Sequence, residues 1–272
     1  MLDILHAEFY KFKGMFKRYY IDSLAEIVSY LILFVGLSFT ILNNHLSTEN
    51  ALFQLIIGIF IWYVGINAIA VFTFILQEEM QLGTLEQIFL TRTSLTKMLC
   101  GRAFATFLFD SIGGIVLSCT TIIVVNIFSN SISLSDFIIV NVSWVGVLLV
   151  LVLTMIGIYG FAFILAGLSI VYKRISAITV ILNYIFLFFT GITLTGNTLP
   201  PVLDIVSKIL PITWGITNLQ NLVIGHSTIQ DLVGSNIFLY LVMNSAIYLT
   251  VGLFIFKLML KVSKKDGSLG HY

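Results

Sequence analysis

Long apolar runs dominate this chain, and they restrict its fold more strongly than any motif does. Of its 272 residues, 58% are hydrophobic and only 10% are charged, which leaves too little polar surface to cover a soluble globule. A bilayer core of about 30 Å needs roughly 20 apolar residues in each spanning helix. Six runs approach or exceed that length: 24–42, 52–76, 103–128, 138–171, 176–195 and 236–260. Because they lack the strict alternation of lipid-facing strands, we predict an all-α polytopic membrane protein with six transmembrane helices in one domain, 1–272.

The lysines and arginines are distributed very unevenly around these runs. If the chain crosses the membrane at each run, thirteen of its fourteen basic residues lie on one side, and only Lys208 lies on the other. The thirteen are Lys11, Lys13, Lys17, Arg18, Arg92, Lys97, Arg102, Lys173, Arg174, Lys257, Lys261, Lys264 and Lys265. Loops rich in Lys and Arg stay cytoplasmic during insertion. We therefore predict a multi-pass protein of the plasma membrane with an even number of spans and both termini cytoplasmic.

The fourth run, 138–171, is too long for one upright helix. It contains no proline and no cluster of polar turn residues at which it could be divided, and dividing it would give an odd number of spans. We therefore predict one tilted helix with an interfacial or cytoplasmic extension.

Residues 1–22 carry an amphipathic pattern ahead of the first span. Apolar residues from Leu2 to Phe16 recur at helical spacing, and four basic residues accompany them. The segment is too charged and aromatic for the apolar region of a signal peptide, so we expect it to remain on the mature protein. We predict an amphipathic helix lying in the interface, either as a membrane anchor alone or also in contact with a cytoplasmic partner.

All three prolines lie in one external segment, 196–235, between the fifth and sixth runs. They are Pro200, Pro201 and Pro211. Proline interrupts helices, and this segment is too broken to span. We predict a re-entrant helical segment that closes the external mouth of a pathway, with the prolines as gate candidates, because irregular backbone at membrane depth must line a cavity or be covered by protein. An amphipathic helix on the outer surface is the alternative.

The segment between the second and third runs, 77–102, has the highest density of charge outside the termini. Glutamates and basic residues alternate along it, and spaced apolar residues supply an intermittent apolar face. We predict a cytoplasmic helix that lies flat below the membrane. In this interpretation Thr84 caps a helix that begins just after Gly83, and Glu86 lies in its first turn. A solvated connecting loop is the alternative that this spacing leaves open.

A short motif in this segment resembles the signature of a transporter family. It reads EMQLGTLEQ over 79–87, directly follows the second run, and precedes a Thr/Ser-rich turn and Gly101-Arg102 at the start of the third run. In these features the chain resembles the type-2 ABC export permeases, which are membrane subunits of ATP-binding cassette exporters. The six-span layout, the amphipathic N-terminus and the external prolines extend the resemblance over nearly the whole chain. Gln81 and Arg92 depart from the family pattern, which has an acidic residue and a proline there.

The resemblance implies a permease subunit that is not itself an enzyme. It implies a homo- or heterodimer of six-span subunits, in which the loop of each subunit docks into a cleft of a separate ATP-binding cassette ATPase subunit. The ATPase would bind ATP and magnesium, so this chain itself would hold no cofactor. We expect membrane lipid, but no nucleic acid, among its other partners.

The resemblance also assigns the motif residues to coupling with the ATPase subunit. These residues are Glu79, Gly83, Thr84, Leu85, Glu86 and Gln87. The two glutamates would offer charges to basic residues of the partner, and Leu85 would offer an apolar knob. Gly83 would permit a tight turn out of the second span, with a positive φ.

The energy source separates the two function classes that remain. The chain has no G-x-x-x-x-G-K-[ST] phosphate-binding loop, so ATP would act through a partner. A self-sufficient channel or ion-coupled carrier is the alternative, and ion coupling usually requires intramembrane acidic or histidine residues. Within the spans, the acidic residues are Asp110 and, near the cytoplasmic end of the first, Glu26. Asp110 and Asn183 are intramembrane polar candidates, either for structural pairing or for substrate passage.

The remaining composition favours an amphipathic or lipid-like cargo and no metal. The two cysteines and four histidines are scattered without metal-ligand spacing, so we predict no metal site and no disulfide. A wide passage with few charges would suit an amphipathic or lipid-like substrate; drug-like and peptide or glycan substrates remain open.

Overall fold

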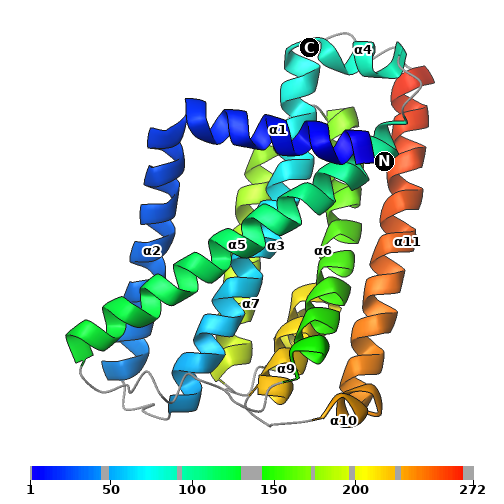
Figure 1. Cartoon of the computed structure of the whole chain (residues 1–272). Helices are drawn as coiled ribbons and strands as arrows, with labels where there is room; N and C mark the ends of the chain where they lie inside the picture. The colour runs from blue at the N-terminus through cyan, green and yellow to red at the C-terminus, as the bar shows by residue number, and fades with distance from the viewer. Residues whose placement is uncertain are drawn as a thin grey trace.

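The computed structural model describes residues 2–43, 49–90, 94–129, 143–172, 175–195, 200–223 and 228–265. Throughout these residues the regular structure is helical (Figure 1). The helices are α1 (Leu2–Arg18), α2 (Tyr20–Asn43), α3 (Glu49–Gln81), α4 (Thr84–Leu90), α5 (Leu95–Ser129), α6 (Trp144–Tyr172), α7 (Ser176–Thr195), α8 (Pro201–Ile209), α9 (Pro211–Val223), α10 (Ile229–Val233) and α11 (Asn236–Lys265).

The long helices confirm the predicted membrane fold. Five of the described helices, α2, α3, α5, α6 and α11, are long and apolar enough to cross a membrane. Helix α7 has 20 residues, which corresponds to ~30 Å at the rise of an α-helix and therefore matches the thickness of a bilayer core. The chain is thus a multi-pass helical membrane protein, with five such helices among the described residues, and α7 lies at the position of the predicted fifth span.

Two predicted helix boundaries are corrected by the structure. The fourth span begins at Trp144, because Ser143 is not helical and its hydroxyl accepts a hydrogen bond from the Gly146 N–H at 3.3 Å. A side chain that satisfies an otherwise unpaired N–H marks a helix start, so the prediction of one unbroken helix from residue 138 is wrong at that end; residues 138–142 lie outside the described part of the chain. The N-terminal helix ends at Arg18 rather than at residue 22, and the chain turns into α2 after Tyr19.

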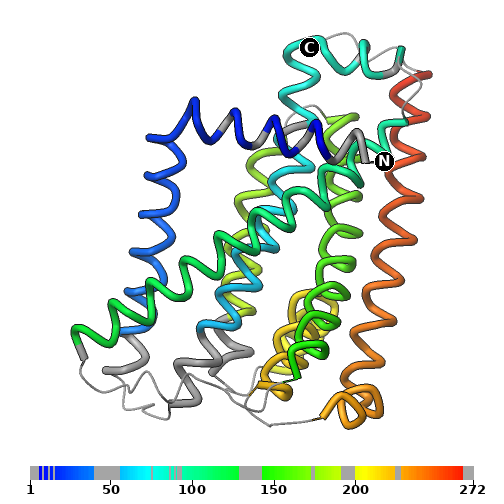
Figure 2. Tube along the Cα trace, viewed as in Figure 1, coloured from blue at the N-terminus to red at the C-terminus, as the bar shows by residue number. Residues whose placement is uncertain are grey.

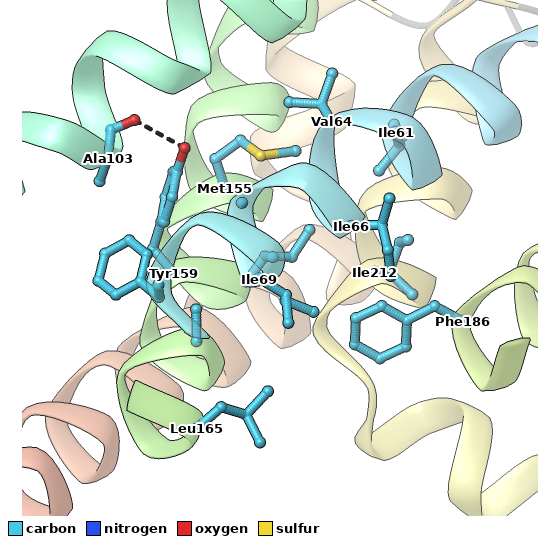
Figure 3. Packing of buried hydrophobic residues seen from close by; sticks show 14 of the residues in the cluster. Ile61, Val64, Ile66, Ile69, Ala103, Met155, Tyr159, Leu165, Phe186 and Ile212 are labelled. Carbon is cyan, nitrogen blue, oxygen red and sulfur yellow. Dashed lines mark hydrogen bonds between the residues drawn. The ribbon is translucent and has the colours of Figure 1, made fainter. Parts of the chain in front are cut away.

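The core of the bundle forms around α3. Fully buried side chains of α3, α6, α7 and α9 interlock there, among them Ile61, Ile69, Phe186 and Ile212 (Figure 3). Tyr159 supplies a polar contact within this apolar core, because its hydroxyl donates to the Ala103 carbonyl oxygen at 2.7 Å. Helix α3 therefore packs against the spans α2, α5, α6 and α7, whereas α11 packs against α6.

Helices α6 and α11 approach each other through glycines. A Cβ added at Gly160 would overlap the backbone of Tyr248 and Leu249, and one added at Gly252 would overlap the Gly160 carbonyl. Small residues let backbones come close where lipid supplies no hydrophobic driving force between helices. This close contact ties the last span to the core.

The two ends of the bundle differ in what covers them. Helices α1 and α4 and the C-terminal end of α11 lie at one end, whereas α9 and α10 lie at the other (Figures 1 and 2). The segments that carry most of the predicted cytoplasmic charge therefore share one end. Which side of the membrane this end faces stays a prediction from the charge distribution.

Cysteine labelling tests that topology. After Cys100 and Cys119 are replaced with Ala, Gln230→Cys on α10 should react in intact cells with a membrane-impermeant maleimide, whereas Gln87→Cys on α4 should react only after the membrane is opened. Both side chains are exposed, so the chain itself shields neither thiol from the reagent. Labelling of Gln87→Cys from outside would overturn the predicted orientation.

Candidate functional site

The motif-bearing loop forms a short helix that turns away from the end of α3. The α3 helix closes with hydrogen bonds from the Leu82 N–H to the Glu78 carbonyl oxygen at 2.9 Å and from the Gly83 N–H to the Met80 carbonyl oxygen at 3.1 Å. Gly83 has a φ of +69°, and it is the only glycine with a positive φ among the described residues. A side chain is disfavoured in this left-handed conformation. The predicted turn at Gly83 is therefore confirmed, and α4 follows it directly.

Glu79 joins four helices at this end of the bundle. Its carboxylate lies 3.5 Å from Lys11 Nζ of α1 and 3.6 Å from an Arg102 guanidinium nitrogen of α5. The Thr84 hydroxyl of α4 donates to the same carboxylate and, at 3.2 Å, to the Glu79 carbonyl oxygen. The side chain of Arg102 is only 3% exposed and that of Glu79 14%. Glu79 therefore holds α1, α4 and α5 against α3.

These contacts revise the predicted role of Glu79. The sequence interpretation directed this carboxylate toward basic residues of a partner, but its charge is already paired within the chain. The pairing arises because α1 packs against α5, which in turn packs against α3 (Figure 1). Glu79 therefore connects α3 to α1, α4 and α5, and its contact with an ATPase subunit stays a prediction.

The structure also revises the predicted roles of Thr84 and Leu85. Thr84 is the first residue of α4, and its hydroxyl donates back to Glu79 instead of accepting from the N–H groups of its own helix. The predicted cap is therefore wrong. Leu85 is fully buried within the apolar core, where it anchors α4 from below, so it is not the outward knob that the sequence interpretation assigned.

The outward face of the loop is formed by other residues. Leu82 is 68% exposed and Leu90 is 88% exposed, and the Gln87 side chain between them is also exposed. The Glu86 side chain lies outside the described part of the structure. Sequence reasoning selected neither Leu82 nor Leu90 among the coupling residues. The spacing of Gln87 and Leu90 indicates one shared helix face, but not that this face turns outward.

The proline-rich segment forms a bent helix pair. Helices α8 and α9 meet at an angle of 89°. Pro200 and Pro201 are exposed at the start of α8, and Pro211 is buried at the start of α9. With 9 and 13 residues, neither helix is long enough to cross a bilayer alone. Helix α9 packs against α3, α6, α7 and α11, as the predicted re-entrant segment requires.

Side chains of the bundle satisfy the backbone groups that the bend leaves unpaired. The Ile209 carbonyl oxygen accepts from Asn244 Nδ2 at 3.1 Å and from the Tyr248 hydroxyl at 3.0 Å, and the Lys208 carbonyl oxygen accepts from Trp214 Nε1 at 2.8 Å. Broken backbone at membrane depth needs such partners. The bend between α8 and α9 is therefore stabilised by side chains of α9 and α11.

The two intramembrane polar candidates lie on different helices, α5 and α7, and each contacts α3. Asp110 Oδ1 on α5 accepts from Asn67 Nδ2 on α3 at 3.4 Å, the amide pairing that sequence reasoning allowed. Asn183 on α7 accepts from Trp62 Nε1 through its backbone oxygen at 3.4 Å. The structure does not join Asp110 and Asn183 into one site.

Among the described residues there is no group of three His, Cys, Asp or Glu side chains that could hold a metal ion. Cys100 and Cys119 are free thiols. A scan against protein-family models and a search of curated proteins found no match. The family assignment suggested by the motif at 79–87 therefore remains an expectation from sequence. The structural argument for a function rests on the arrangement of the loop.

Proposed function

We propose that this chain is the permease subunit of an ATP-binding cassette exporter, of the type-2 class that its motif resembles. A separate nucleotide-binding subunit would bind and hydrolyse ATP with magnesium. The permease would use that energy to move an amphipathic, lipid-like, drug-like or peptide or glycan substrate outward. The observation that carries the proposal is the arrangement of the loop 79–90. The loop is held to the bundle by buried Leu85 and by the Glu79 ion pairs, and its outer face exposes Leu82 and Leu90.

A force-transmitting element must be fixed firmly to what it moves. Leu85 anchors α4 in the core, and Glu79 connects it to α1 and α5. A displacement of α4 would therefore be transmitted to α1, α3 and α5. A solvated connector needs neither the buried leucine nor the interhelical ion pairs.

The same element must also present a surface to its partner. Leu82 and Leu90 are exposed at the end of the bundle where α4 and the last turns of α11 lie. Large apolar side chains exposed beside charged residues, outside the apolar spans, fit the desolvated centre of a protein interface better than they fit water. In this proposal the partner surface covers them.

The proposal includes a second copy of the permease. One six-span unit without an internal repeat rarely encloses a wide passage between separable halves. Helix α2 buries little of its surface against its own chain, which leaves it available to a second subunit or to lipid. The bent pair α8–α9 would close the external mouth of the passage between the two halves.

Purification from native membranes in mild detergent tests the proposal. We expect two permease chains with two nucleotide-binding subunits in native mass spectrometry, and ATP hydrolysis that changes when the permease is removed from the complex. Transport by the pure chain in liposomes without nucleotide would instead support a channel or an ion-coupled carrier. A fully active complex with a single six-span chain would refute the dimer.

A further inference from the structure

A cavity of about 820 Å³ lies between α1, α2, α3 and α5. Helix α1 forms its roof at the end of the bundle that carries α4 (Figure 1). Its lining is rich in aromatic rings, including Phe9 and Phe16 of the roof and Tyr63 and Phe109 of the walls. The rings of Phe9 and Phe109 lie 4.9 Å apart and connect the roof to α5. The volume lies within the range of pockets that hold drug-sized ligands.

Two carboxylates face this aromatic cavity. Glu26 lies six residues, or ~9 Å, beyond the start of α2, and Asp110 lies eight residues, or ~12 Å, beyond Arg102 on α5. Both residues line the cavity and lie close enough to interact electrostatically. Acidic groups at this depth are costly unless something compensates them, which makes them candidates for function.

The carboxylates lack a cationic partner within the described chain. No described lysine, arginine or histidine forms an ion pair with Glu26 or Asp110. Asp110 Oδ1 is paired with the amide of Asn67, but Asp110 Oδ2 is buried without a hydrogen-bond partner among the described residues. The basic groups at the cavity, Lys13 and His6, come from the roof helix α1.

We propose that this cavity binds an organic cation carried on an apolar body, with its charge between Glu26 and Asp110 and its apolar part against the aromatic walls. Aromatic faces attract cations, most strongly where water is excluded, and the carboxylates supply the opposite charge. Glu26 is exposed along α2, which gives such a molecule lateral access. The ligand is either a free amphiphilic cation or the ammonium headgroup of an amine lipid.

Equilibrium binding to the full-length chain in phosphatidylglycerol nanodiscs tests this site. The probe is radiolabelled tetraphenylphosphonium, and triphenylphosphine oxide serves as its neutral counterpart. We expect saturable binding of the cation above that of empty discs, with the dissociation constant raised about tenfold in Glu26→Gln and in Asp110→Asn. Asp22→Asn, one turn earlier on α2 and outside the cavity lining, should bind as the unmodified chain does.

The outcomes decide the site and its ligand source. Cation binding that is unchanged in both variants, or equal affinity for the neutral compound, would overturn the proposal. If Asp110→Asn fails to fold because its contact with Asn67 changes, the exposed Glu26→Gln still decides the question. Phosphatidylethanolamine that weakens probe binding, and that is retained in native mass spectra by the unmodified chain but not by Glu26→Gln, would identify an amine lipid; the absence of both effects would identify a free cation.

This inference does not depend on the proposed export function. The measurement uses neither nucleotide nor an ATPase subunit. A failed cation site would therefore leave the exporter proposal intact, and a failed exporter proposal would leave the cation site intact.

Discussion

Replacing Glu79 with Gln should destabilise the fold by about 3 kcal/mol, because removing one member of a buried ion pair typically costs about 3–5 kcal/mol. The cost arises mainly at Arg102, whose side chain is only 3% exposed. The loss of stability should lie at the lower end of this range, because the glutamine side chain still accepts a hydrogen bond from the Thr84 hydroxyl and because Arg102 makes a further interaction. The Lys11 pair should add little, since that lysine is 43% exposed and exposed pairs are worth ~0–1 kcal/mol.

Thermal unfolding of the purified protein in a fixed detergent measures this effect. Glu78→Gln is the matched control, since Glu78 is the exposed neighbour of Glu79 on α3. In the assembled exporter, Glu79→Gln should also reduce substrate transport per ATP hydrolysed, because α4 loses its connection to α1 and α5. If the two variants unfold at the same temperature, the interhelical role of Glu79 is wrong.

Replacing Leu90 with Asp should weaken binding of the ATPase subunit by roughly 30-fold or more, because interface hot spots contribute about 2 kcal/mol or more each. Leu90 is almost fully exposed, so its replacement removes no packing inside the chain. The fold should therefore unfold at an unchanged temperature while assembly fails. Leu82→Asp should act in the same direction on the other edge of the loop.

The affinity of the detergent-purified permease for its nucleotide-binding subunit measures this second effect. Val233→Asp provides the control, because Val233 is an exposed apolar residue of α10 at the opposite end of the bundle. It introduces the same charge where no ATPase contact is proposed. Normal assembly and transport with both Leu82→Asp and Leu90→Asp would show that the loop is a connector and would remove the main support for the exporter proposal.

Local features of the sequence determined the membrane architecture and much of the loop backbone. The length of an apolar run determines whether a helix can cross a bilayer, and the prolines confine the break to α8–α9. Only glycine adopts a positive φ without strain, so Gly83 indicated the turn before α4. Ser143 is a similar local signal, and it was missed because the apolar run was searched only for prolines and clusters of polar turn residues, not for a single capping side chain.

Tertiary structure alone decided which way side chains face and what they pair with. Spacing along α4 separates two faces, but the neighbouring helices decide that Leu85 turns inward and Leu90 outward. The Glu79 contacts depend on α1 lying across the end of α3, which no local pattern specifies. Glu26 and Asp110 are far apart in sequence and line one cavity only because α2 and α5 pack beneath the same roof helix. Periodicity is a property of one helix, whereas ion pairs and cavities require several helices to be positioned together.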